Sequence, residues 1–467
     1  MRAEGDTIQT ARPEAAALSQ IVNMLHKIKE ALKHGEESQN VAVGPDAVLR
    51  VSVVSFECSL RQHIRKPLRT CARSTVEIQI YLFLDVVLDM VPGLFVSNRR
   101  WPAGSSAATS RETPVTSKER VLQSFRHRSP DRVPLDYSAA AELNARLMER
   151  FQLPDYEALL LKLHVDFRHM DKWGNMVPRY VGPELKRYPD GTCEDYWGLR
   201  YRKIEYKPGC FYEELVQPPL ANASTVKDVE KHLWPKPEWI DFSAIPDYCK
   251  EHNDYCLVGG LGATFDMVGY FRGMEQGMVD IYDNPALVEA IIAKLFEFKY
   301  EYNLRMLQAA GGRLDILFVS EDMGSQNGLI VSKETLKRYV FPCLEKFAQL
   351  AHKYKAMLML HSDGAIYDII PELIELGVDI INPVQPGCPG MDPARLKREF
   401  GKQLCFHGLL DTQHLMPYGS PHDIMTEIKK LAAEVGAGGG LALAPSNNFQ
   451  IDVPLPNIMA VYGMKSS

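Results

Sequence analysis

The clearest sign of the fold class lies in residues 314–364, LDILFVSEDMGSQNGLIVSKETLKRYVFPCLEKFAQLAHKYKAMLMLHSDG. Two short apolar runs, at 314–322 and 356–364, flank a helical pattern over 332–354 that starts at the capping residue Ser332. An apolar strand, a helix and a second apolar strand form a unit typical of parallel sheets. Each run also ends in ionisable residues, which is unusual for a buried strand.

The same unit recurs on both sides of this stretch. Further apolar runs are VPLDY (133–137), HVDFRHM (164–170), YCLVGGLG (255–262), DIINPVQ (379–385), LCFHGLLD (404–411) and GLALAPSNN (440–448). Helical patterns include SKERVLQSFRH from Ser117, behind a capping pattern at Thr116, and the period over 284–309, which starts at Asn284. Eight such units predict an α/β fold, a (β/α)8 TIM barrel.

The alternation is interrupted once, at about 171–254, by a stretch rich in Trp, Tyr and Pro. We expect a long insertion after the second strand, with small hairpins of its own, that overhangs the barrel mouth. The barrel domain is predicted to span residues 116–467.

Residues 1–115 read differently, because they are mildly basic whereas the rest is acidic. We expect an unassigned N-terminal extension with an amphipathic helix at 15–34 and a Ser/Thr/Pro-rich linker at 102–117. The most apolar stretch, 76–96, contains Glu77, Asp85 and Asp89, and acidic groups disfavour a membrane span. It is predicted to pack as a strand or helix on the main domain.

The composition excludes several classes of protein. Of the 467 residues, 46% are hydrophobic and 24% charged, which is typical of a globular chain rather than a disordered or multi-span membrane protein. A net charge of -6 argues against general affinity for nucleic acid. The nine cysteines are scattered without a C-x-x-C pair, which favours a reducing compartment and a cytoplasmic location.

Polar side chains gather where the predicted strands end. They are Asp136, Arg168, His169, Asp171, Glu321, Asp322, His361, Asp363, Asn382, Gln385, His407, Asp411, Asn447 and Asn448. Parallel barrels carry their active sites at the carboxyl ends of the strands, so these residues predict an active site at the mouth. Of the adjacent pair Glu321 and Asp322, we expect one to cap a turn and the other to face the pocket.

Residues 116–463 resemble the uroporphyrinogen decarboxylase superfamily. The resemblance rests on SKERVLQSFRHRSPDRVPLDY, GGLGATFDMVGYFRGMEQGMVDIYDNP, VSEDMGSQNGLIVSKETLKRYVFP, HSDGAIYDIIPELIELGVDIINPVQP, HGLLDTQHLMPYGSP and LAPSNNFQIDVP. It implies a (β/α)8 barrel and one of two chemistries. One is cofactor-free decarboxylation of the acetate arms of a tetrapyrrole, and the other is methyl transfer from a corrinoid to a zinc-activated thiol.

The zinc branch has a His and a Cys in an H-x-C pattern after strand five and a Cys in the strand-eight loop. Here these positions are His361, Asp363 and Ser446, so both thiolates are missing. Zinc that activates a thiol favours sulfur ligands. The resemblance therefore implies no metal, with His361 and Asp363 as weak candidates for ligands through nitrogen and oxygen.

The decarboxylase branch has a Tyr after strand three, matched by Tyr270, and an Asp near the end of strand two, matched by Asp171 with Asp166 as a competitor. Asn447 stands where the family has a strand-eight His, and the Arg-rich motif after strand one is absent. The first hypothesis is a metal-independent decarboxylase of a tetrapyrrole or related carboxylate. Asp171 or Asp166 would hold the ring nitrogens, while Tyr270 and His361 supply hydrogen bonds or a proton.

Predicted substrate contacts are Arg168, which would pair with a carboxylate, and Glu321, Asp322, Gln326, Asp363, Asn382, Gln385, His407, Asp411 and Asn447. Two alternatives remain open: a corrinoid-dependent methyltransferase with an altered metal site, and a non-catalytic binder of tetrapyrroles. We expect no cofactor unless the methyltransferase hypothesis holds, which would require a corrinoid or zinc. The expected partner is a small molecule, a tetrapyrrole or corrinoid, without nucleic acid or membrane, in a chain that could form a homodimer.

Overall fold

The computed structural model describes the backbone of residues 39–44 and 47–51, and residues 115–170, 177–207 and 210–464. The chain divides into two compact units, Met1–Arg111 and Glu112–Ser467. In the first unit, β1 (Gln39–Gly44) pairs antiparallel with β2 (Ala47–Val51). The helix predicted at 15–34, the apolar stretch 76–96 and nearly all of the linker lie outside the described residues. Of the helices in the described ranges, none is both long and apolar enough to cross a lipid bilayer.

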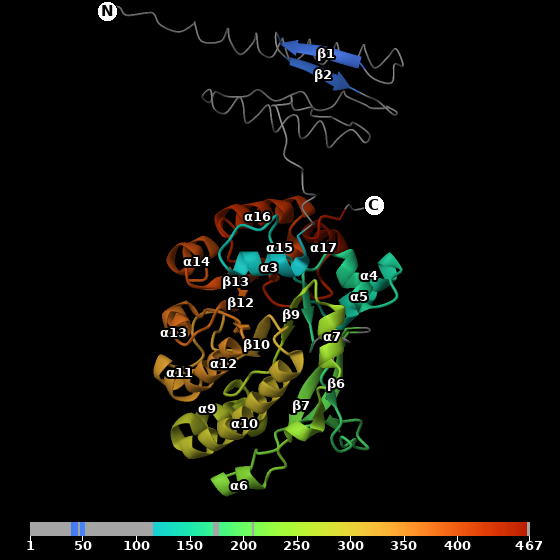
Figure 1. Ribbon diagram of the computed structural model, residues 1–467. Helices are drawn as coiled ribbons and strands as arrows, with labels where there is room; N and C mark the ends of the chain where they lie inside the picture. Colours follow the sequence, from blue (N-terminus) through green and yellow to red (C-terminus); the bar gives the residue numbers. More distant parts are fainter. Residues whose placement is uncertain (1–38, 45–46, 52–114, 171–176, 208–209, 465–467) are drawn as a thin grey trace, which may run out of the picture. The chain divides into compact units, whose positions relative to one another are not determined.

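The second unit is built on a parallel sheet of seven strands, in the order β14-β13-β12-β11-β10-β9-β3. The strands are β3 (Phe167–His169), β9 (Cys256–Gly259), β10 (Ile316–Ser320), β11 (Met357–His361), β12 (Ile380–Val384), β13 (Cys405–Leu410) and β14 (Leu441–Pro445). Figure 1 shows the helices around this curled sheet. The strand order follows the chain order, as consecutive βα units require.

The segment predicted as the first strand, residues 133–137, takes the eighth position in the barrel, between β14 and β3. Leu135 forms a parallel bridge with Leu443 of β14, and its carbonyl accepts the N–H of Asp166, which precedes β3. These contacts connect the two edges of the sheet, so the predicted TIM barrel is confirmed. The first strand is reduced to this short contact.

The helices follow the predicted capping signals. Helix α3 (Ser117–Phe125) begins at Thr116, which forms a capping box with Glu119. Helix α10 (Pro285–Ala310) covers the predicted 284–309 period. The single helix expected over 332–354 is instead two, α11 (Lys333–Tyr339) and α12 (Phe341–Lys353). The break falls before Pro342, because proline has no N–H to continue the helical ladder and is suited to a first turn.

The remaining helices of the barrel enclose the sheet. They are α4 (Ala141–Phe151), α5 (Tyr156–Lys162), α8 (Asp266–Arg272), α9 (Met274–Asp283), α13 (Ile370–Glu375), α14 (Pro393–Phe400), α15 (Leu415–Tyr418), α16 (Pro421–Glu434) and α17 (Leu455–Val461), with the 3-10 turn Tyr367–Ile369 before α13. Every residue of β13 and β14 is buried, so side chains on both faces of these strands are removed from water. Such burial on both faces is typical of a parallel sheet covered by helices.

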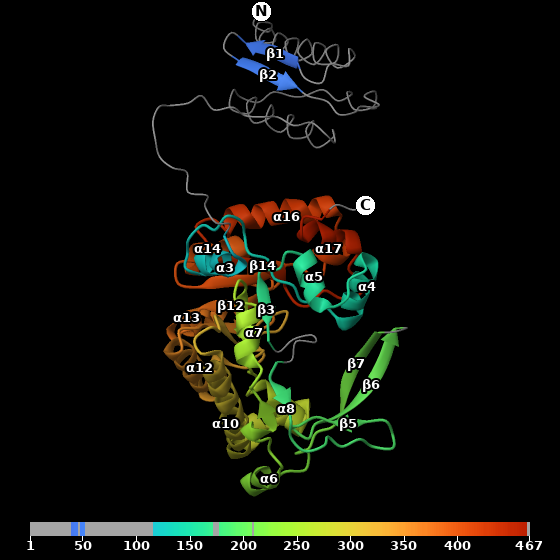
Figure 2. The ribbon, with the colours of Figure 1, turned by 45° about the vertical axis from the view of Figure 1, so that its right-hand side comes forward.

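The insertion after β3 forms small antiparallel hairpins, as expected. Strand β4 (Arg179–Tyr180) pairs with β8 (Ile240–Asp241), and β5 (Cys193–Glu194), β6 (Arg200–Lys207) and β7 (Cys210–Gln217) form a second sheet. Helices α6 (Val226–Lys231) and α7 (Ile245–Glu251) and the 3-10 turn Pro237–Trp239 complete it. The N–H of Leu220 donates to the carbonyl of Phe271, so the insertion packs against α8, which follows β9 (Figure 2).

Candidate active site at the carboxyl ends of the strands

A continuous line of hydrogen bonds crosses three neighbouring strands at the mouth. His361 ends β11 and lies in register with Asn382 of β12. The Oδ1 atom of Asn382 is 2.7 Å from Nδ1 of His361, and its Nδ2 atom is 2.6 Å from Nδ1 of His407 on β13. One amide therefore joins two imidazoles, and it fixes the orientation of both rings.

The line continues to a buried carboxylate on the first strand. Asp136 is 3% exposed, and its Oδ2 atom lies 3.0 Å from Nε2 of His407 and 2.9 Å from Nε2 of His169. Burial by itself would raise the pKa of Asp136, but His169 and His407 outweigh it and lower the pKa well below its ordinary value. Asp136 is therefore an ionised carboxylate held between two imidazoles.

Asp136 and His169 were recognised as polar strand ends, but the sequence hypothesis gave neither of them a role. The available signal was the spacing in HVDFRHM, where Phe167 and His169 share one face of a strand. Phe167 packs edge-on against His407, with ring centroids 5.6 Å apart, so that face points into the barrel.

Two carboxylates approach the other side of His361. The ligand-type atoms of Asp322, His361 and Asp363 all lie within 4.8 Å of one another. Nε2 of His361 is 3.8 Å from Oδ1 of Asp322, and the same Oδ1 accepts the N–H of Asp363 at 2.9 Å. Asp322 follows β10 and Asp363 follows β11, so adjacent strands bring the two carboxylates together.

Asp363 has two differently placed carboxylate oxygens. Oδ2 accepts a hydrogen bond of 2.7 Å from Nδ2 of Asn447, whereas Oδ1 is buried and has no hydrogen-bond partner among the described residues. Burial raises the pKa of this carboxyl group, since the charged form loses its hydration. Ser446, at the third position of the zinc pattern, instead lies 3.3 Å from the hydroxyl of Thr412. A buried unpaired oxygen beside a second carboxylate and an imidazole is suited to a cation.

Glu321 is buried and holds a neighbouring loop instead of facing the mouth. Its carboxylate accepts the backbone N–H groups of Thr264, Phe265 and Asp266 and the hydroxyl of Thr264. These donors lie at the start of α8, where unpaired N–H groups favour a negative charge. Glu321 thus holds the loop after β9, and its neighbour Asp322 is the one that approaches His361.

Helix α8 carries two further groups beside this loop. Burial raises the pKa of Asp266 to about 6, with added repulsion from Glu321 and Asp322. Tyr270 is 38% exposed, and burial together with the nearby charges of Asp266 and Asp322 raises its pKa. The Tyr270 side chain therefore lies at an accessible part of the mouth.

The other predicted contacts are placed in the loops that follow the strands. Gln385 is buried and accepts the N–H of Gly364 at 3.0 Å, and Gln326 is exposed with its Oε1 atom 3.7 Å from the thiol of Cys388. Asp411 accepts the N–H groups of Gln413 and His414, so it shapes its own turn. Asp171 lies outside the described residues.

The prediction for Arg168 is wrong. Its side chain is fully buried on the outer side of β3, where it bonds Glu157 of α5 at 2.9 Å and lies 3.7 Å from the ring centroid of Tyr255. Alternation along the strand directs Arg168 away from the face that carries Phe167 and His169. The guanidinium therefore stabilises helix packing and does not reach the mouth.

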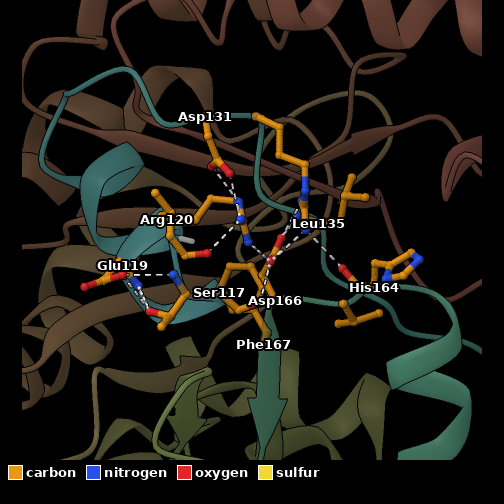
Figure 3. Close-up of polar contacts among 12 residues, drawn as sticks. Ser117, Glu119, Arg120, Asp131, Leu135, His164, Asp166 and Phe167 are labelled. Carbon is orange, nitrogen blue, oxygen red and sulfur yellow. Dashed lines mark hydrogen bonds and ion pairs between the residues drawn. The ribbon is translucent and has the colours of Figure 1, made fainter. Parts of the chain in front are cut away.

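Asp166 is also misplaced by the sequence hypothesis. It precedes β3, so it lies at the amino end of that strand, whereas the mouth is at the carboxyl ends. Figure 3 shows Asp166 among its polar partners. Its carboxylate accepts hydrogen bonds of 2.7–2.9 Å from Arg120, Arg132, Ser117 and the N–H of Leu135. These donors connect α3, the first strand and β3, which assigns Asp166 to the closure of the barrel rather than to substrate binding.

One solved structure supports this architecture. The chain matches a solved methyltransferase from Methanosarcina mazei with a TM-score of 0.53 and 16% identity, over 74% of this chain and 97% of that one. A second solved structure, the IOLI protein with a bound zinc atom, matches with a TM-score of 0.27 and 13% identity, over 47% and 77% of the two chains. No curated protein matches the sequence.

The sequence model of one family covers more than half of the chain. The model for uroporphyrinogen decarboxylase (URO-D) matches residues 212–464, from β7 of the insertion to the residues after α17. The chain belongs to the uroporphyrinogen decarboxylase family.

Proposed function

We propose that the chain is a metal-dependent enzyme that transfers a methyl group from a corrinoid to a thiol, with Asp322, His361 and Asp363 as the metal ligands. The observation that carries the proposal is the approach of their ligand atoms to within 4.8 Å of one another at the mouth. The sequence hypothesis had a pair, His361 and Asp363. The third ligand, Asp322, comes from the neighbouring strand end.

The donor set fits a divalent ion such as zinc. Catalytic zinc sites use three protein ligands from His, Asp, Glu and Cys and leave a further position open. With bonds of about 2.0 Å, tetrahedral zinc places its ligand atoms about 3.3 Å apart. The 3.8 Å between Nε2 of His361 and Oδ1 of Asp322 is close to that spacing. Oδ1 of Asp363 is buried and has no hydrogen-bond partner in the described part of the chain, which supports the same conclusion because a cation would satisfy it.

Held by Asp322, His361 and Asp363, a divalent ion would supply Lewis acidity, which would lower the pKa of a thiol substrate. The residues of the chain hold and orient the site. Asn447 anchors Asp363 through Oδ2, and the N–H of Asp363 anchors Asp322. Tyr270, partly exposed on α8, is available to hydrogen-bond a substrate at the entrance.

The charge of the mouth favours methyl transfer over decarboxylation of a tetrapyrrole polycarboxylate. Asp266, Asp322 and Asp363 add negative charge there, and a polycarboxylate substrate calls for arginines instead. Arg168 is paired with Glu157 on the outer side of β3, and Arg272 of α8 is buried against Asp280. Both guanidinium groups are thus already neutralised by carboxylates of the chain.

The proposal is tested by metal content and by two parallel assays. Purified protein is expected to contain one zinc or related ion per chain, measured by mass spectrometry, and to consume methylcobalamin in the presence of an alkyl thiol. His361→Ala and Asp322→Asn should lose both properties. His352→Gln is the matched control, because His352 also pairs with a carboxylate, Asp379, at 2.8 Å, but at the outer end of α12.

Uroporphyrinogen serves as the competing substrate in the second assay. Formation of coproporphyrinogen by metal-free protein, with no turnover of methylcobalamin, would refute methyl transfer and restore the decarboxylase hypothesis. Binding of porphyrins or cobalamins in a spectral titration, without turnover in either assay, would instead indicate a non-catalytic binder.

A further inference from the structure

We infer that Asp136, His407 and Asn382 set the tautomer of His361, and so keep the lone pair of its Nε2 atom directed at Asp322 and Asp363. These three are positioning residues, since they act on the ligand through hydrogen bonds. The functional meaning of this tautomer rests on the proposed metal site. The inference itself is carried by a different observation, the line of hydrogen bonds across four strands.

The first step concerns the direction of the bonds to Asp136. An ionised carboxylate only accepts hydrogen bonds, so both Nε2 atoms that face it, from His169 and His407, must carry protons. Asp136 is 3% exposed, so these two hydrogen bonds replace the water that its carboxylate loses on burial.

The amide beside His407 fixes the role of the second ring nitrogen. The side chain of His407 is 3% exposed, and its Nδ1 atom lies 2.6 Å from the Nδ2 atom of Asn382. Since Nδ2 only donates, Nδ1 of His407 accepts, and the ring proton is on the Nε2 atom that faces Asp136.

The orientation of the Asn382 amide, which is set by His407, determines which nitrogen of His361 carries the proton. The Nδ2 atom of Asn382 donates to Nδ1 of His407 at 2.6 Å, which leaves Oδ1 to face Nδ1 of His361 at 2.7 Å. Since Oδ1 only accepts, Nδ1 of His361 must donate. A neutral imidazole, the form that binds metals, has only this one proton, so Nε2 has a free lone pair.

The distance on the far side of His361 agrees with this assignment. Nε2 lies 3.8 Å from Oδ1 of Asp322, beyond hydrogen-bond length, as expected for two acceptors that face each other. A proton on Nε2 would remove the lone pair that a metal needs. The charge of Asp136 thus determines whether His361 can serve as a ligand.

The experiment measures zinc affinity of the full chain by competition with a chromophoric chelator. Asn382→Leu and Asp136→Asn should each weaken zinc binding by about 10- to 100-fold, the usual effect of losing an outer partner of a metal ligand. Asn382→Asp should bind zinc about as tightly as the wild type, because a carboxylate still accepts from Nδ1 of His361. His352→Gln should leave the affinity unchanged. Equal affinity of wild type, Asn382→Leu and Asp136→Asn would overturn the inference.

A second measurement on zinc-free protein separates this inference from the proposed function. Nitrogen NMR of labelled histidine should show the His361 proton on Nδ1 in the wild type and a shift of the proton towards Nε2 in Asp136→Asn. A wild-type His361 protonated on Nε2 would overturn the inference whatever the metal content. A wild type that binds no zinc but shows the expected tautomers would overturn only the proposed metal site.

Discussion

Carboxylates occupy both ends of this barrel, and their surroundings are opposite in character. At the amino end, Asp166 accepts hydrogen bonds from two arginines, a serine and a backbone N–H. At the mouth, Asp322 and Asp363 lie beside each other, and one oxygen of Asp363 is buried without a partner among the described residues. The first arrangement stabilises the folded chain, whereas the second holds like charges together at a cost. Donors thus surround the carboxylate that closes the barrel, whereas the carboxylates at the mouth leave an acceptor atom open to a ligand.

The largest expected change in stability concerns Asp166 at the amino end of the barrel. Asp166→Asn leaves the guanidinium of Arg120, which is 9% exposed, facing an uncharged amide. Loss of one partner from a buried ion pair costs about 3–5 kcal/mol, so the free energy of unfolding should fall by about 3 kcal/mol. Urea denaturation measures it. The control Asp131→Asn, in which a 43% exposed partner of Arg120 is replaced, should lose about 1 kcal/mol or less. Equal losses in the two variants would contradict the contrast.

The next largest effect is the stabilisation of the folded chain by zinc bound at the mouth. Zinc at about 100 times its dissociation constant should raise the free energy of unfolding by about 2.7 kcal/mol, because it binds only the folded chain. Thermal unfolding with and without zinc detects the shift. His361→Gln should abolish the shift, and Asp166→Asn should keep it despite its lower starting stability. A shift of the same size in His361→Gln would show that zinc binds elsewhere.

A pH-dependent effect follows from Asp266. Its pKa is raised from 3.8 unfolded to about 6 in the folded chain, mainly by burial. The folded state therefore holds the proton more tightly, and the group lowers stability progressively as pH rises from about 4 to about 6. Asp266→Asn should be about 2 kcal/mol more stable than wild type at pH 7 and nearly equal to it at pH 4. Denaturation curves across this range test the prediction, and a constant difference at all pH values would contradict it.

The smallest effect concerns Asp363. In metal-free protein, Asp363→Asn replaces a carboxylate whose Oδ1 atom is buried without a partner among the described residues, and the new amide can donate to Asp322, so the free energy of unfolding should rise by about 1 kcal/mol. The same variant should lose zinc binding. Urea denaturation in the presence of a chelator, beside a zinc titration, measures both. A less stable variant would indicate that the carboxylate is already satisfied, and the contrast between the two ends would fail.

The positions of the strands could be predicted because each apolar run is bounded by polar or turn residues. The direction of individual side chains could not. In a barrel covered by helices, both faces of a strand are buried, so hydrophobic alternation does not tell inside from outside. Arg168 and His169 are neighbours in HVDFRHM, and only the packing of Phe167 against His407 shows which one faces inward.

The exact ends of the strands explain the remaining differences between the predicted and the observed site. The run was expected over 164–170, but β3 spans only Phe167–His169, which leaves Asp166 at the amino end. The sequence predicts that one of Glu321 and Asp322 faces the pocket but not which one, because the place of Asp322 beside His361 depends on the loop after β10, where the N–H of Asp363 fixes it. Such a contact between loops of different strands has no periodic signal in the sequence.

The short first strand has a consequence for the order of folding. Leu135 bridges Leu443, and the hydroxyl of Ser124 in α3 donates to the carbonyl of Leu441, so the last gap in the wall joins segments about 300 residues apart. During synthesis on the ribosome, β14 is therefore made long after α3 and the first strand. The barrel can close only after β14 has emerged, and until then the side of the first strand that later faces β14 stays unpaired, as an edge that can pair with another chain. Aggregation during synthesis should therefore respond to changes at Leu135 and Ser124 more strongly than the stability of the finished protein does.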